Sequence, residues 1–328
     1  MLTRNERGLT LLSMIVTLAI LSMIAFSTVA LTDNADQQSR YEETRARLGQ
    51  IRRAMTGERN AVYAGQALLS GFVPENGLLP ATLGDLFQTP TGFDTFGVRS
   101  PIFDPDPDLS TGINNGGAET ALGAPNERLL KGHRPYLYRP VGGGGYFDGW
   151  GNRGAPPNDG WVITADATHF QSESLGAEGA VGGAGIYAQD MADDVVGNDW
   201  AQTLDGWGVT LLNKTGGEIT LTPPLRVSLL VYVNDADSAN AYNWRRITSN
   251  PIVGVIPDGG FVTATFPDTA PDTFVPIGEH LLMAINDPDG TPHTGDDTPY
   301  LNADGSRASE QAVFFPMTTR PGVTLTLR

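Results

Sequence analysis

The chain has 328 residues, of which 40% are hydrophobic and 8% aromatic, so it can bury the cores of two domains. Its 40 glycines and 23 prolines favour strands and turns, and the absence of cysteine excludes disulfides and thiol chemistry. The net charge is −16, and residues 61–328 hold thirteen Lys and Arg against 31 Asp and Glu. That acidity argues against nucleic-acid binding by this part, and it suits either calcium loops or solubility alone.

The first predicted element is an apolar helix. Residues 9–31 carry no charge; Arg4 and Arg7 precede them, and Asp33 and Asp36 follow. As a helix the segment is about 35 Å long, enough to cross a bilayer core of about 30 Å. The positive-inside rule places the N-terminus in the cytoplasm.

A secretory signal peptide is the alternative interpretation of the same segment. The apolar region of a signal peptide is typically shorter, about 7–15 residues. Residues 28–30, Thr-Val-Ala, nevertheless form an acceptable cleavage site. From the sequence, the alternative stays open.

An amphipathic stretch follows the apolar one. Four apolar residues there fall on one helical face: Tyr41, Leu48, Ile51 and Met55. Arginines and glutamates occupy the other positions, and Gly57 is a suitable stop. The pattern predicts one helix over about residues 9–56, whose second half packs its apolar face on a globular domain.

The N-terminus resembles that of type IV prepilins and type II secretion pseudopilins. The family has a charged leader ending in glycine, then Phe-Thr-Leu-Ile-Glu and a hydrophobic run; here Gly8 precedes Leu-Thr-Leu-Leu-Ser. The resemblance implies that prepilin peptidase cuts between Gly8 and Leu9 and methylates the new amino group. It also implies a single-pass protein of the bacterial inner membrane, with its globular part in the periplasm. Its partners would be other pilins or pseudopilins and the inner-membrane assembly platform.

Ser13 departs from the family, which has a glutamate at this position. In the family that carboxylate, costly in lipid by itself, pairs with the N-terminal ammonium of a neighbouring subunit. Among the type II secretion pseudopilins, the member without the glutamate is the large minor one proposed to sit at the filament tip. Ser13 therefore favours a minor, tip-like subunit, with drift at one position as the alternative.

Two later stretches resemble the C-terminal region of the major pseudopilin. The family's Asp-x-Trp-Gly-Asn turn is matched by Asp148, Trp150, Gly151 and Asn152. Its Ser-Leu-Gly-Ala-Asp-Gly calcium loop is matched by residues 174–179, with a glutamate for the aspartate. The calcium ligands that the resemblance implies are Leu175, Glu178, Asp193 and Asp194; because the loop is longer than the family's, Asp190 is a competing ligand. Oxygen ligands on a glycine-rich loop suit calcium, but an acidic loop closed by its own hydrogen bonds is the alternative.

From residue 217 the apolar residues recur with a period of two. Within residues 225–233, Val227, Leu229, Val231 and Val233 share one face, and turn-rich stretches separate the later runs. This predicts an antiparallel β-sandwich. Its acidic loop offers a second, weaker set of calcium ligands, namely Asp287, Asp289, Asp296 and Asp297. A solvated turn is the alternative interpretation.

These elements together predict an α+β protein. Its parts are a leader (1–8), the helix (9–57), a pilin-like domain with that helix on an antiparallel sheet (58–216), and the β-sandwich (217–328). We expect a structural subunit and no enzyme, because Gly-x-Ser-x-Gly, His-Glu-x-x-His and P-loop motifs are absent and the four histidines are scattered. The alternatives are an exported or membrane-anchored ligand-binding protein such as an adhesin and, with less support, an anchored hydrolase.

Overall fold

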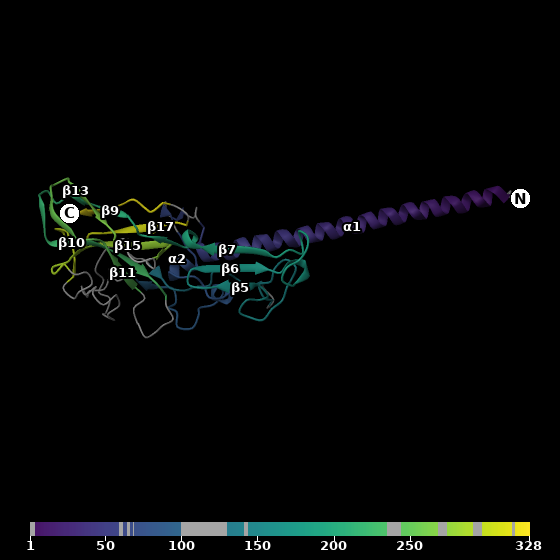
Figure 1. Ribbon diagram of the computed structural model, residues 1–328, viewed down its shortest axis with the longest axis horizontal. Coiled ribbons are helices and arrows are strands. Elements are labelled where there is room, and N and C mark those ends of the chain that lie inside the picture. The colour runs from purple at the N-terminus through teal and green to yellow at the C-terminus, as the bar shows by residue number, and fades with distance from the viewer. Residues whose placement is uncertain are drawn as a thin grey trace.

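The computed structural model describes most of the chain as an α+β protein, with one long N-terminal helix followed by antiparallel sheets (Figure 1). The described residues are 4–58, 62–63, 66–67, 69–99, 130–140, 144–234, 244–267, 274–290, 297–316 and 319–328. Residues 1–3 of the predicted leader and Asp296 of the second predicted calcium loop lie outside them.

The N-terminal helix α1 runs without a break over Arg4–Thr56, about 80 Å at 1.5 Å per residue. It ends where Gly57 adopts a left-handed conformation (φ 79°) and donates its N–H to the Arg53 carbonyl (2.8 Å). One continuous helix is therefore confirmed, and it begins five residues ahead of the predicted start at Leu9.

The two halves of α1 have different surroundings. The N-terminal half projects away from the globular part (Figure 1), and its described large apolar side chains from Leu12 to Leu31 are 49–77% exposed. In the C-terminal half, Leu48, Ile51 and Met55 are at most 5% exposed. The predicted amphipathic face is therefore the buried one, whereas the apolar half has no protein partner among the described residues.

The buried face of α1 packs on a small sheet and a short helix. The sheet has the antiparallel order β5-β6-β7, with β5 (Val162–Ala165), β6 (His169–Ser174) and β7 (Met191–Val196). The shorter elements between α1 and residue 200 are β1 (Val62–Tyr63), β2 (Gln66–Ala67), α2 (Phe72–Asn76), η1 (Leu83–Leu86), β3 (Val98–Arg99), β4 (Leu130–Lys131), η4 (Gly176–Glu178) and η5 (Gly197–Asp199). The buried apolar residues of α1, α2, η1 and this sheet form one core, called the helix core below. Phe72, Leu83 and Phe170 are fully buried in it.

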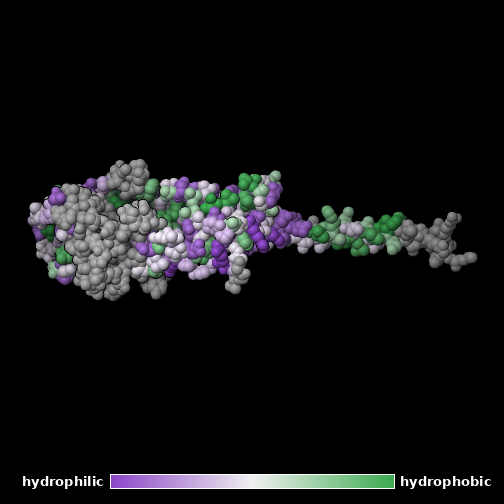
Figure 2. All heavy atoms as spheres, turned by 90° about the horizontal axis from the view of Figure 1, so that it is seen from below, coloured by the Kyte–Doolittle hydropathy of each residue, from purple (hydrophilic) through white to green (hydrophobic). Residues whose placement is uncertain are grey.

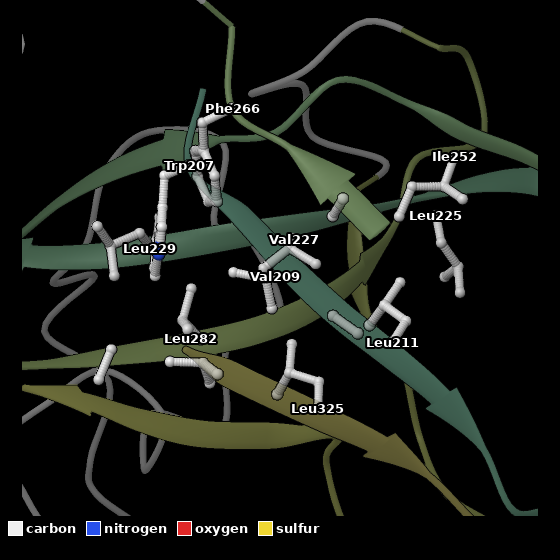
Figure 3. Packing of buried hydrophobic residues seen from close by; sticks show 14 of the residues in the cluster. Trp207, Val209, Leu211, Leu225, Val227, Leu229, Ile252, Phe266, Leu282 and Leu325 are labelled. Atoms are coloured by element: carbon white, nitrogen blue, oxygen red, sulfur yellow. The ribbon is translucent and has the colours of Figure 1, made fainter. Parts of the chain in front are cut away.

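Two further sheets face each other as a β-sandwich. One sheet is centred on β10 (Ile219–Tyr232) and β15 (Gly278–Asn286), and the other has the order β13-β9-β18. The remaining strands of the pair are β9 (Gly208–Asn213), β11 (Trp244–Thr248), β12 (Ile252–Ile256), β13 (Phe261–Thr265), β16 (Thr298–Pro299), β17 (Ser309–Phe314) and β18 (Val323–Leu327). Alternate residues such as Val227 and Leu229 from β10 meet Val209, Leu211 and Leu325 from the other sheet (Figure 3).

The sandwich begins earlier than residue 217, the predicted boundary. Strand β9 pairs antiparallel with β13 and parallel with the C-terminal β18. Trp207, 4% exposed, stacks on Phe266 with ring centroids 5.0 Å apart. Strand β9 therefore belongs to the sandwich, although it lies within residues 58–216, the predicted pilin-like domain. Its partner strands come much later in the chain.

Polar contacts join the helix core to the sandwich. Asn234, after β10, donates its backbone N–H to the Asn76 carbonyl (2.7 Å) and its side-chain amide to Asn76 Oδ1 (2.9 Å). Ile277, which follows β14 (Phe274–Pro276), is buried in the helix core. The same α2 segment thus carries contacts to both cores.

Candidate functional site

The apolar half of α1 is the first candidate site. Among the described residues it is the one helix long and apolar enough to cross a membrane. Its hydroxyl groups bond back to carbonyls one turn earlier: Thr17 to Ser13, Ser22 to Leu18, Ser27 to Met23, Thr28 to Ile24 and Thr32 to Thr28, all within 2.9 Å. Polar groups satisfied inside the helix are what a segment in lipid requires.

The predicted processing and assembly residues all lie in this half. Gly8 and Leu9 are within the first turns of α1, where the structure describes the backbone alone. Ser13 is exposed on the projecting helix, and its carbonyl accepts the Thr17 hydroxyl (2.8 Å). No charged group therefore lies on the described apolar face, which fits lipid or a neighbouring apolar helix.

The predicted turn at residues 148–152 ties the globular part to α1. Gly149 donates its N–H to Thr44 Oγ1 (2.9 Å), and a Cβ at Gly149 would overlap the Arg40 carbonyl, so only glycine fits against the helix here. Asp148, 5% exposed, accepts hydrogen bonds from the Asn152 N–H (2.9 Å) and from Ser174 Oγ (2.6 Å). The buried carboxylate thereby holds the turn against the end of β6.

Residues 175–190 form the β6–β7 loop, which closes largely on itself. Ala177 donates its N–H to the Tyr187 carbonyl (2.8 Å), and Gly182 donates its N–H to Asp190 Oδ2 (2.7 Å). Gly176 has φ 61°, and a Cβ there would stand 2.7 Å from the Ala188 carbonyl oxygen. The glycines therefore allow a compact loop whose backbone crosses itself at close range.

Of the calcium ligands predicted in and beside the β6–β7 loop, Asp190 is the one with a free carboxylate oxygen that is buried. Its second carboxylate oxygen, Oδ1, is buried and has no hydrogen-bond partner, and such an oxygen is suited to a hard cation. Glu178 is exposed. No cluster of three or more side chains of the metal-binding type is found among the described residues.

The acidic pair on β7 takes part in other contacts. Successive side chains of a strand point to opposite faces. Asp193 Oδ1 accepts from Arg52 Nη1 (2.8 Å), whereas the Asp194 carboxylate is 3.4 Å from His169 Nε2. Arg52 also pairs with Asp199 (2.9 Å). The pair thus serves to hold β7 to α1 and to β6.

No motif in the sequence pointed to the cluster that Arg52 forms with Asp193 and Asp199. Burial lowers the pKa of Arg52, but Asp193 and Asp199 beside it more than offset this, so its pKa lies above the usual value. Its position held a signal: Arg52 lies four residues after Leu48 and three before Met55, on the face that packs inward. A cation at such a position requires a buried or half-buried acidic partner.

In the second predicted calcium loop, Asp287 is the partner of a buried arginine. Asp287 is 0% exposed, its Oδ2 is ion-paired with Arg226 Nε, and Arg226 also donates to the Ser249 and Gly290 carbonyls (2.9 and 2.8 Å). The pairing of β15 with β16 ends at Asn286 and Thr298, so Asp287 directly follows β15 and Asp297 directly precedes β16. The pair Arg226–Asp287 therefore stabilises the end of the sandwich, while Asp287 Oδ1 is buried without a hydrogen-bond partner.

Comparisons of the chain with protein-family models, with curated proteins and with solved structures find no match. The chain is an α+β protein with an N-terminal helix able to cross a membrane.

Proposed function

We propose that the chain is a membrane-inserted, pilin-like structural subunit. It would be stored in the bacterial inner membrane through α1 and assembled at or near the tip of a type II secretion or type IV pilus-like filament. The observation that carries the proposal is the division of α1: an exposed apolar half and a buried amphipathic half on one uninterrupted helix. Such a helix couples movement of the membrane segment directly to the globular part.

Ser13 supports a place at the tip. An apolar helix leaving lipid must keep its apolar surface covered, which the apolar helices of other subunits can do. A subunit that starts a filament has no earlier subunit to supply an ammonium partner, so a carboxylate at this position would stay unpaired at a high cost. Serine avoids that cost, because its hydroxyl can bond to the helix backbone.

The proposal includes calcium in the β6–β7 loop. Asp190 would supply the carboxylate, through the Oδ1 atom that lacks a protein partner, and the Leu175 carbonyl and Glu178 are the further ligands that the resemblance implies. Bound calcium would hold the loop in one conformation. It would have no catalytic part, since the proposed role is assembly.

The test is the N-terminal sequence of the chain isolated from its native membrane. A chain that starts at N-methylated Leu9 supports prepilin processing and retention of α1. The variant Gly8→Ala is the matched control, because prepilin peptidase cuts after glycine, and this variant should keep its leader. A start near Leu31 in the wild-type chain would contradict the proposal, since α1 would then be a cleaved signal peptide and an exported ligand-binding protein would remain.

A further inference from the structure

We infer that the β6–β7 loop rests on the headgroup layer of the membrane that α1 enters, with Val181 and Ile186 as its contact residues. Val181 is 84% exposed, more than any other large apolar side chain that the structure describes, and Ile186 is 69% exposed. Exposing such side chains to water is unfavourable, by an amount proportional to the apolar area. Both side chains lie in one loop, so a single contact of that loop with lipid would remove both from water.

The loop lies at the end of the globular part from which α1 emerges. Figure 1 shows the connection from β6 to β7 at that end. Tyr187 Oη donates to Gln38 Oε1 (3.0 Å), and the Tyr187 ring meets Tyr41 edge-on at 6.1 Å. In Figure 2, hydrophobic residues gather at this end, beside the place where the helix leaves. The loop is thus the described part of the globular surface held against the exit of the helix.

The distances along α1 agree with contact to lipid headgroups. Gln38 is seven residues beyond Leu31, the last residue of the apolar run, which corresponds to about 10 Å along the helix axis. The headgroup layer on each side of a bilayer is about 5–7 Å thick. A loop that is held beside Gln38 through Tyr187 therefore has to extend only a few ångströms to reach the headgroup layer.

The chemistry of the loop matches a lipid surface better than a charged partner. Residues 175–190 contain two acidic residues, Glu178 and Asp190, and no basic residue, and Asp190 is bonded within the loop. Tyr41, which contacts the loop through Tyr187, also meets Trp150 edge-on, with ring centroids 6.3 Å apart. Trp and Tyr are the residues enriched at membrane interfaces. The inference rests on insertion of α1, as in the proposed function, but it does not depend on filament assembly.

The test uses the full-length chain in phosphatidylcholine nanodiscs, one molecule per disc. The chain has no cysteine, so Val181→Cys and Ile186→Cys each carry a single environment-sensitive fluorophore. Val253→Cys, at a 69% exposed valine of β12, is the matched control, and Leu21→Cys reports insertion of α1. Lipids with a nitroxide near the headgroup should remove about half of the emission at 181 and 186, because quenching needs the shallow burial typical of interfacial segments, and none at 253.

Each outcome has one meaning. Emission at 181 and 186 that the nitroxide leaves unchanged, while a deep nitroxide quenches the label at 21, overturns the inference and leaves membrane insertion intact. A blue shift at 181 without nitroxide quenching also overturns it, because protein and not lipid then covers the loop. No quenching at 21 would mean that α1 is not inserted, and both the inference and the proposed function would fail.

Discussion

Asp190 and Asp193 are close in the sequence but differ in what their carboxylates contact. Asp193 is held by Arg52, whereas Asp190 keeps one buried oxygen without a partner. We expect calcium to raise the Tm of the wild-type protein and EDTA to reverse the gain, because a ligand that binds only the folded state stabilises it. Asp190→Asn should abolish this calcium effect. Asp193→Asn should lower Tm equally with calcium and with EDTA; a calcium effect lost in this variant would instead make Asp193 a ligand.

We expect His280 to make the folded protein less stable in acid. It is 1% exposed, its Nε2–H donates to the Pro276 carbonyl (2.7 Å), and burial, together with the nearby Lys131, lowers its pKa to about 3. Below pH 6.5 the unfolded chain binds a proton at this histidine that the folded chain does not. The free energy of unfolding therefore falls as the pH drops from 6.5 toward 3.

The variant His280→Gln should remove that part of the pH dependence. Between pH 7 and pH 5 the wild-type protein should lose about 2 kcal/mol more than the variant, from 1.36 kcal/mol per pH unit below the unfolded pKa of about 6.5. Urea unfolding at both pH values measures the difference. Equal losses in the two proteins would show that His280 takes up its proton in the folded state.

At the scale of elements, the two halves of α1 should respond differently to the same kind of substitution. Ile51 is 0% exposed in the helix core, so Ile51→Ala should cost about 2–5 kcal/mol of unfolding free energy through the cavity it leaves. Leu21 is 60% exposed, and Leu21→Ala should change that energy by less than about 0.5 kcal/mol. Thermal unfolding in detergent compares them; a similar loss in both variants would contradict the division of the helix.

For the whole molecule, the globular part should fold without the apolar half of α1. The described large apolar side chains up to Leu31 are exposed and do not contribute to either core. A chain that starts at Asp33 should therefore be soluble in water and keep the Tm of the full-length protein. Starting at Arg47 should lower Tm, because the contacts of Gln38 and Thr44 with the globular part are lost. An aggregated or unfolded chain from Asp33 would show that the apolar half stabilises the fold.

Local patterns predicted the parts that depend on neighbouring residues. The face with Leu48, Ile51 and Met55 is set by the helical period of 3.6, and it is buried as predicted. The turn at residues 148–152 was predicted by resemblance, and within it Asp148 accepts the N–H of Asn152 four residues later. The alternation along β10 places Val227 and Leu229 in the sandwich core.

Pairings between distant segments could not be predicted in this way. Parallel pairing of β9 with β18 joins residues near Val209 to residues near Leu325, and neither strand carries a local mark of the other. For that reason the sequence did not indicate that β9, which precedes residue 217, pairs with strands of the sandwich. Likewise, the partner of Arg52 could not be read from the spacing of acidic residues, because the pairing depends on which face of β7 meets α1.

The sequence by itself determined that the chain begins with a helix able to cross a membrane and that its second half has one apolar face. Both follow from residue order within a few helical turns. The tertiary structure decided that the sandwich includes β9, that Asp193 and Asp194 bond to different partners, and that the β6–β7 loop lies beside the exit of α1. These depend on contacts across long stretches of chain, where burial and pairing, and not local preference, set the lowest free energy.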